Sequence, residues 1–196
     1  MTEVRLPDAF GLPETFSYRQ ARDRGVSKRR LYGWRDDGVV EVVGRGLFRR
    51  AGAALADLDL IEVVHRAPEA TLCLTSALVR HDLSDAIPAV HDVAVPRGRW
   101  APMVAAPVRW HRFDPDTFEV GRETLRLDDE TEIGLYGAAR SVVDAFRLVS
   151  LQGSDVAHEA LRRWLRAGGK PAELLAVAAH FPRVLPRLRA ALEVLL

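Results

Sequence analysis

Hydrophobic and polar positions in the first fifty residues predict two short helices followed by a hairpin. Residues 18–24 and 28–37 contain no proline, and each stretch follows a serine and stops at a glycine, which is typical of short capped helices. The β-branched run 39–43 is joined to residues 47–50 by a glycine-rich turn, which predicts a β-hairpin. Helix, turn, helix and hairpin in this order predict a winged helix-turn-helix in which the hairpin is the wing.

The rest of the chain alternates between strand-like and helical patterns. Apolar residues recur every three positions from Leu55 to Val64, which predicts a helix that ends before Pro68. Further strands are predicted over residues 71–75, 91–95 and 108–113, and further helices over residues 76–81, 138–148, 155–166, 171–180 and 182–195. Strands followed by helices are typical of an α+β protein. We therefore expect a winged helix-turn-helix over 1–52 and a mixed α/β domain, ending in a helical bundle, over 53–196.

The composition is that of an ordinary soluble protein and excludes several classes. The chain has 196 residues, of which 48% are hydrophobic and 28% are charged. Its single cysteine, Cys73, permits neither an intramolecular disulfide nor a zinc site built on cysteine. The apolar runs are far shorter than the ~20 residues that span a bilayer, and the N-terminus lacks the pattern of a secretory signal. We therefore expect a cytoplasmic protein that does not associate with membranes.

The net charge of +1 is the sum of two oppositely charged parts of the chain. Residues 17–50 contain ten basic and four acidic residues, a net charge of +6, so the remainder carries −5. A small basic module is therefore followed by a larger, mildly acidic one. Positive charge concentrated on a small module is typical of proteins that bind nucleic acids.

The second predicted helix has one apolar face and one basic face. On a helical wheel Leu31 and Trp34 lie about 60° apart and form the face that we expect to be buried. Arg29, Tyr32 and Gly33 lie roughly opposite. Arginine there suits a phosphate or a guanine, tyrosine suits a phosphate or a base edge, and glycine permits a close approach of the helix to DNA.

This arrangement predicts an interface with DNA. Arg45 lies at the tip of the predicted hairpin, where it is placed to enter a minor groove or hold a phosphate. The predicted DNA contacts on the helix and the hairpin are Ser27, Lys28, Arg29, Arg30, Tyr32, Arg35, Arg45 and Arg49. For the helix alone, a solvated basic face is an equal alternative. Its combination with the turn and the arginine-tipped hairpin favours DNA.

Two stretches of the second part carry charge of opposite sign. Residues 96–112 contain four arginines and no acid, and Arg97 and Arg99 are candidates for additional phosphate contacts. Residues 114–132 contain eight acids and two arginines, a composition that suits a basic partner. For both stretches a solvated or mutually paired surface is the alternative. Further on, Arg140 and Asp144 lie four apart on a predicted helix, where we expect an ion pair worth a few tenths of a kcal/mol.

The sequence contains no signature of a familiar catalytic or metal site. The six histidines show no HExxH pairing, and neither a Gly-x-Ser-x-Gly elbow nor a Walker loop is present. Lys28 and Lys170 are the only lysines, so the E-x-K triplet of one large nuclease class is missing. We expect no enzymatic activity, no cofactor and no metal ion, and a nuclease remains as an alternative.

Residues 16–32 (FSYRQARDRGVSKRRLY) and 42–49 (VVGRGLFR) carry a resemblance to a known family. They are similar to the N-terminal domain of the AbiEi family of antitoxins, which belong to bacterial type IV toxin–antitoxin systems. The order of weaker motifs in its C-terminal region is matched by residues 74–83, 90–98 and 139–146. The resemblance rests on the order and spacing of these motifs, which extend over most of the chain.

The resemblance implies a function and two partners. Members of the family bind repeats in their own promoter through the winged helix and need the C-terminal domain to counter a nucleotidyltransferase toxin. We therefore expect a DNA-binding antitoxin that represses its own promoter, with double-stranded DNA and a cognate nucleotidyltransferase toxin as partners and two copies on each operator. The alternative is a stand-alone winged-helix transcriptional regulator whose second domain binds a ligand or dimerises.

Overall fold

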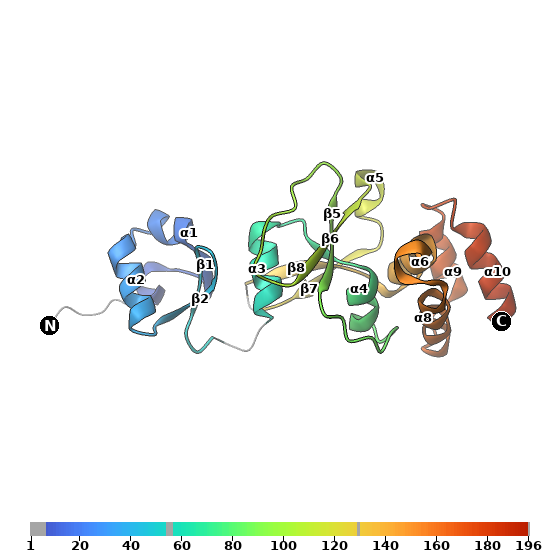
Figure 1. Ribbon diagram of the computed structural model, residues 1–196, viewed down its shortest axis with the longest axis horizontal. Coiled ribbons are helices and arrows are strands. Elements are labelled where there is room, and N and C mark those ends of the chain that lie inside the picture. The colour runs from blue at the N-terminus through green and yellow to red at the C-terminus, as the bar shows by residue number, and fades with distance from the viewer. Residues whose placement is uncertain (1–6, 54–56, 129, 196) are drawn as a thin grey trace. The chain divides into compact units, whose positions relative to one another are not determined.

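The computed structural model describes residues 7–53, 57–128 and 130–195. Within these residues the chain forms ten α-helices and two β-sheets, a mixed α+β architecture (Figure 1). The chain divides into two compact units. The first unit comprises Met1–Arg66, Met103–Ala106 and Arg126–Glu132, and the second comprises Ala67–Pro102, Pro107–Leu125 and Ile133–Leu196. Each unit has its own hydrophobic core.

The first unit combines a three-stranded antiparallel sheet with short helices. Its elements are a 3-10 helix η1 (Pro7–Phe10), β1 (Thr15–Ser17), α1 (Tyr18–Asp23), α2 (Lys28–Asp36), β2 (Val40–Gly44), β3 (Leu47–Arg50) and α3 (Leu58–Arg66). The strand order is β1-β3-β2. Apolar side chains of the two helices α1 and α2 meet those of the sheet in one core, which includes Phe16, Leu31, Trp34 and Phe48.

Serine and glycine set the bounds of α1 and α2, as the sequence predicts. The Ser17 hydroxyl accepts a hydrogen bond from the Gln20 amide (3.2 Å), and the Gln20 side chain accepts one from the Ser17 amide (2.7 Å), which forms a capping box. The Ser27 hydroxyl caps α2 in the same way. Gly25 and Gly38, which follow the two helices, have φ of +80° and +70°, a conformation that favours glycine. The predicted helices are therefore confirmed.

The predicted hairpin is also confirmed, as β2 and β3. A register shift between Val42 and Gly44 marks an irregularity in β2 just before the tip. A Cβ atom at Gly44 would lie 2.5 Å from the Glu62 carboxylate of α3, so any other residue there would displace that carboxylate. The same carboxylate accepts hydrogen bonds from the amides of Ala105 and Ala106, at 2.9 and 3.1 Å.

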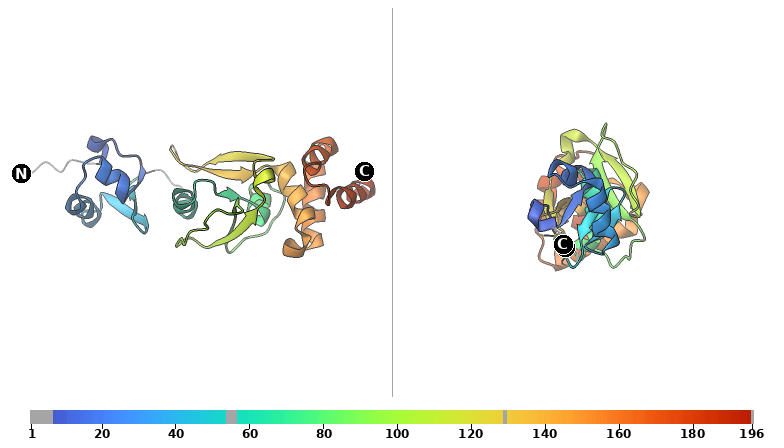
Figure 2. Two further views of the ribbon diagram at one scale, coloured as in Figure 1. Left: turned by 90° about the horizontal axis from the view of Figure 1, so that it is seen from above. Right: turned by 90° about the vertical axis from the view of Figure 1, so that its left-hand side faces the viewer.

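The second unit is built around a five-stranded mixed sheet. Its elements are β4 (Thr71–Leu72), α4 (Leu74–Arg80), β5 (His91–Pro96), β6 (Val108–Phe113), α5 (Pro115–Phe118), β7 (Arg122–Arg126), β8 (Glu132–Tyr136), α6 (Ala138–Arg147), α7 (Val149–Gln152), α8 (Ser154–Arg166), α9 (Pro171–Ala178) and α10 (Leu185–Leu195). The strand order is β6-β5-β4-β8-β7, with β4 antiparallel to β5 and parallel to β8. Strands β7 and β8 run side by side as a hairpin (Figure 2).

Helix α6 is the centre of the helical part of the second unit. It contacts α4, α8, α9 and α10. Its side chains are buried from Arg140 to Phe146, including the polar ones. The apolar core around it includes Val142, Val143 and Leu161. A helix that is buried on most sides is typical of the interior of a domain.

The structure corrects several predicted bounds. The strand predicted over 71–75 ends at Leu72, because α4 begins at Leu74. Strands β7 and β8 were not predicted: β7 lies in the acidic segment 114–132, and β8 begins at the last residue of that segment, Glu132. Leu55 lies outside the described residues. Among the helices of the described residues, none combines the length and the apolar character that crossing a membrane requires.

The division into compact units differs from the predicted domain boundary. Helix α3 packs against β2, so the first unit extends to Arg66 and not only to residue 52. Two later segments, Met103–Ala106 and Arg126–Glu132, also belong to it. Compact units defined by packing need not coincide with functional domains, so the functional boundary at residue 52 stays a prediction.

Candidate nucleic-acid interface

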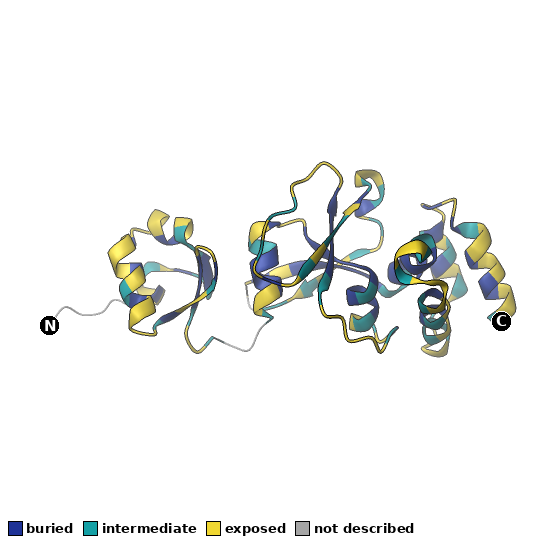
Figure 3. Ribbon diagram, viewed as in Figure 1, coloured by how far each residue is buried: buried dark blue, intermediate teal, exposed yellow. Residues whose placement is uncertain are grey.

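Helix α2 buries the apolar face that the helical wheel predicts. Leu31 and Trp34 are buried, and the Trp34 ring meets the Phe10 ring edge-on, with 5.7 Å between the centroids. The other sides of α2 are exposed over most of the helix (Figure 3). The packing therefore fixes which residues of α2 are available to a partner.

Three residues of α2 form a stacked group on its exposed surface. The Lys28 Nζ atom and the Arg35 Cζ atom lie 5.7 and 4.7 Å from the centre of the Tyr32 ring. The Tyr32 ring meets the buried Phe48 ring edge-on at 6.2 Å. Tyr32 therefore links the hydrophobic core of the first unit to two surface cations.

Arg35 also neutralises part of the acidic end of α2. Its guanidinium donates two hydrogen bonds to the Asp36 carboxylate, at 2.6 and 2.9 Å. Both side chains are exposed, and ion pairs of this kind contribute at most about 1 kcal/mol. A phosphate can therefore compete for Arg35 at small cost.

The first turn of α2 carries three consecutive cations, Lys28, Arg29 and Arg30, and no acid. Arg30 stacks on the Phe10 ring, with its Cζ atom 5.3 Å from the ring centre. Among the described residues, Arg29 has no hydrogen bond or ion pair through its side chain. The Ser27 hydroxyl is already used, because it accepts from the Arg30 amide at 3.2 Å.

Arg45 occupies the turn between β2 and β3. Its carbonyl oxygen accepts a hydrogen bond from the Arg66 guanidinium, which ties the turn to α3. Its own side chain is exposed and has no polar partner within the described part of the chain. The hairpin therefore presents one free guanidinium from an anchored backbone.

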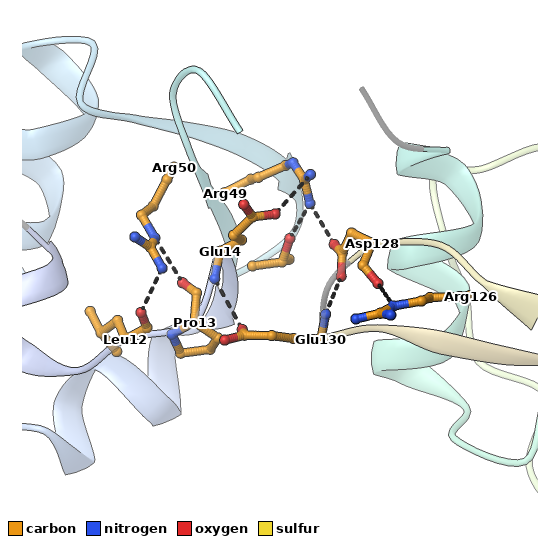
Figure 4. Close-up of polar contacts among 9 residues, drawn as sticks. Leu12, Pro13, Glu14, Arg49, Arg50, Arg126, Asp128 and Glu130 are labelled. Atoms are coloured by element: carbon orange, nitrogen blue, oxygen red, sulfur yellow. Dashed lines mark hydrogen bonds and ion pairs between the residues drawn. The ribbon is translucent and has the colours of Figure 1, made fainter. Parts of the chain in front are cut away.

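Arg49 does not belong to this surface, which corrects the sequence prediction. Only 4% of its side chain is exposed. The guanidinium donates hydrogen bonds of 2.7 Å to the Thr15 hydroxyl and the Asp128 carboxylate, and it pairs with Glu14 at 3.4 Å (Figure 4). A guanidinium that is buried and held by two carboxylates is not available to a phosphate.

The partner of Arg49 comes from the acidic segment. The Asp128 side chain is 2% exposed. Burial raises the pKa of Asp128, but hydrogen bonds from the Arg49 side chain, the Glu130 amide and Thr131 outweigh burial and lower the pKa below its usual value. Nearby, the Glu130 carboxylate accepts a hydrogen bond from the Glu14 amide at 3.2 Å (Figure 4). At least two of the acids in 114–132 therefore serve the packing of the first unit.

Arg97 and Arg99 lie in the second unit and are exposed. Arg97 pairs with Asp114 at 3.6 Å, and Arg99 pairs with Glu69 at 2.9 Å. The structure thus gives each of these candidate phosphate contacts an acidic neighbour. Exposed pairs of this strength do not prevent a phosphate contact.

The pair of Arg140 and Asp144 is buried, which corrects the expectation of a weak surface pair. Their side chains are 0% and 1% exposed, with the Arg140 Nε atom 3.0 Å from Asp144. Asp144 also accepts a hydrogen bond from the Arg147 Nε atom at 2.9 Å. The few tenths of a kcal/mol that an exposed ion pair contributes to stability do not apply here. Removing one partner of a buried pair leaves an uncompensated charge in the core.

A comparison with models of known protein families finds no match, and a search of curated protein sequences also finds none. The resemblance to the AbiEi family therefore stays a prediction.

Proposed function

We propose that this protein binds double-stranded DNA through a winged helix-turn-helix in its first unit, with α2 as the recognition helix and the hairpin β2–β3 as the wing. The observation that carries the proposal is the surface of α2 opposite Leu31 and Trp34. This surface presents Lys28, Arg29 and Tyr32 to solvent, and the packing of the helix fixes their orientation.

The charge at the start of α2 supports a bound anion. Cations in the first turn oppose the helix dipole, which costs about 0.3–1 kcal/mol each when no anion is present. No acid of the first turn compensates Lys28, Arg29 and Arg30. A DNA phosphate at this end would be attracted by the cations and by the free amides of the first turn.

The hairpin supports the same role. Arg45 extends from a turn that is anchored to α3, and a single guanidinium at a hairpin tip suits the minor groove or a phosphate. The proposed DNA contacts are Ser27 through its backbone, together with Lys28, Arg29, Arg30, Tyr32, Arg35 and Arg45. Arg97 and Arg99 remain candidates for additional contacts.

We further propose that the protein is an antitoxin that represses its own promoter and counters a nucleotidyltransferase toxin, as the resemblance to the AbiEi family implies. In this proposal α6–α10 form the helical bundle of the domain that acts on the toxin. The alternative is a transcriptional regulator without a toxin. Expression of a nucleotidyltransferase from a neighbouring gene, with and without this chain, separates the two, because only an antitoxin restores growth.

A gel-shift titration with the upstream promoter DNA tests the DNA-binding proposal. Replacing Arg29 and Arg45 by alanine should weaken binding and reduce the slope of log affinity against log salt by about 1.8, since each lost phosphate contact removes about 0.9. A matched control replaces Arg166 and Arg189, two exposed arginines of the second unit, and should leave the slope unchanged. An unchanged slope in the Arg29 and Arg45 variant would overturn the proposal.

A further inference from the structure

The second unit contains a pocket of about 700 Å³. It lies among β6, the junction of α6 and α7, and residues 180–184. Pockets of 300–1,000 Å³ are of the size that binds small molecules and cofactors. No sequence motif points to this pocket, because its walls come from segments far apart in the chain.

Positive charge predominates in the walls of the pocket. Four arginines and one aspartate line it: Arg97, Arg112, Arg147, Arg183 and Asp114. Arg97 pairs with Asp114 at 3.6 Å. Among the described residues, Arg112 and Arg183 have neither a hydrogen bond nor an ion pair through their side chains. Two of the lining arginines therefore have no protein partner for their guanidinium groups, one in β6 and one just before α10.

Arg147 adds a third, preorganised guanidinium. Its Cζ atom lies 4.8 Å from the centre of the Phe113 ring and 5.0 Å from that of Phe181. Its Nε atom is held by Asp144. The Arg147 side chain is 24% exposed and lines the pocket, so its positive charge is fixed in the pocket wall.

The pocket also offers apolar and aromatic surface. Trp110 is partly exposed, and Leu151 is one of the exposed large hydrophobic residues of the chain. Both line the pocket together with its arginines. Guanidinium groups bind phosphate through paired hydrogen bonds, and an indole ring stacks on a planar base. Inorganic phosphate alone would leave most of a pocket of this size unfilled.

We propose that this pocket binds a nucleotide, with the phosphates on Arg112, Arg147 and Arg183 and the base against Trp110 and Leu151. The inference does not depend on DNA binding by the first unit. It assigns a small-molecule ligand to the second unit.

Isothermal titration calorimetry on the full chain tests this site with ADP, GDP, CDP and UDP, and with inorganic phosphate and adenosine as partial ligands. At least one nucleoside diphosphate should bind, and the partial ligands should bind at least about tenfold more weakly. The Arg112→Gln, Arg183→Gln double variant should weaken nucleotide binding by about tenfold or more, because both charge-assisted contacts are lost. Both side chains are exposed and unpartnered within the described residues, so this variant should keep its melting temperature.

The matched control is Arg166→Gln with Arg189→Gln, which removes the same charge from exposed positions outside the pocket. It should bind the nucleotide like the unmodified chain. The proposal would be overturned if none of the four nucleotides binds. It would also be overturned if the control variant loses as much nucleotide affinity as the pocket variant. Equal affinity for inorganic phosphate would overturn the assignment of the base. If nucleotides do not bind and the pocket variant loses promoter affinity in the gel shift, the arginines contact DNA and the nucleotide site is wrong.

Discussion

Helices α2 and α6 both combine arginine with aspartate, and they use them in opposite ways. On α2 the cations are exposed, and Arg35 forms only a surface pair with Asp36. On α6 the guanidinium of Arg140 and the carboxylate of Asp144 are fully buried. The difference teaches that burial, and not the residue type or its spacing, decides whether an arginine is available to a partner or is part of the core.

Removing the carboxylate at the centre of α6 should have the largest effect on stability. Asp144→Ala leaves Arg140 as a buried charge without its carboxylate and also removes the partner of the half-buried Arg147, which should cost about 3–5 kcal/mol of unfolding free energy. Urea denaturation followed by circular dichroism measures this change in unfolding free energy. Asp36→Ala on α2 is the control and should cost less than about 1 kcal/mol. Equal losses in the two variants would show that the contrast between the helices is wrong.

Arg49 should behave like the arginines of α6, although it lies in the basic module. Arg49→Gln leaves Asp128 buried without its ion pair, which should cost about 2–4 kcal/mol. The salt dependence of promoter binding should not change at a temperature where the variant is folded, because Arg49 does not reach solvent. If the variant shows a smaller slope of log affinity against log salt in the gel shift, Arg49 contacts DNA and this assignment is wrong.

Gly33→Ala separates stability from DNA binding on α2. A Cβ atom at Gly33 would meet nothing within 4 Å, so alanine should fit and stabilise the helix by about 0.5–1 kcal/mol. If the backbone of α2 approaches DNA, the added methyl group should weaken promoter binding while the melting temperature rises. Higher stability with unchanged affinity would mean that this part of the helix does not face DNA.

The ion pair of Arg49 and Asp128 should also respond to pH, in the acid range. The pKa of Asp128 is lowered in the folded protein, so its ion pair contributes fully above the unfolded value of about 3.9 and is lost as the pH falls through the lowered pKa. The stability difference between the unmodified chain and Asp128→Asn should therefore be constant near neutral pH and should shrink below pH ~4. A difference that persists at lower pH would contradict this assignment.

Local signals in the sequence were sufficient for much of the first unit. Ser17 and Ser27, with the glycines that follow each helix, predict α1 and α2 because capping depends on residues within one turn. The pattern of Leu31 and Trp34 identifies the buried face for the same reason. These features need no knowledge of the distant parts of the chain.

The remaining features depend on contacts between distant residues. The burial of Arg49 requires β1 and the loop around Asp128, which lies 79 positions further along the chain. Strand β7 lies in a segment whose charge suggests solvent, and β8, which begins where that segment ends, pairs with β4 inside the sheet. The pocket around Arg147 joins β6, α6 and residues 180–184. No local pattern contains this information, because register and tertiary packing determine it.

The first unit is discontinuous in sequence, and this limits how the protein can exchange its parts during evolution. A gene fusion that transferred only residues 1–66 would carry Arg49 but leave Asp128 and Glu130 behind. The recipient protein would inherit a buried guanidinium without its carboxylate from the acidic segment. Recombination that moves this basic module into another protein should therefore also bring a matching acidic loop or replace the arginine at position 49.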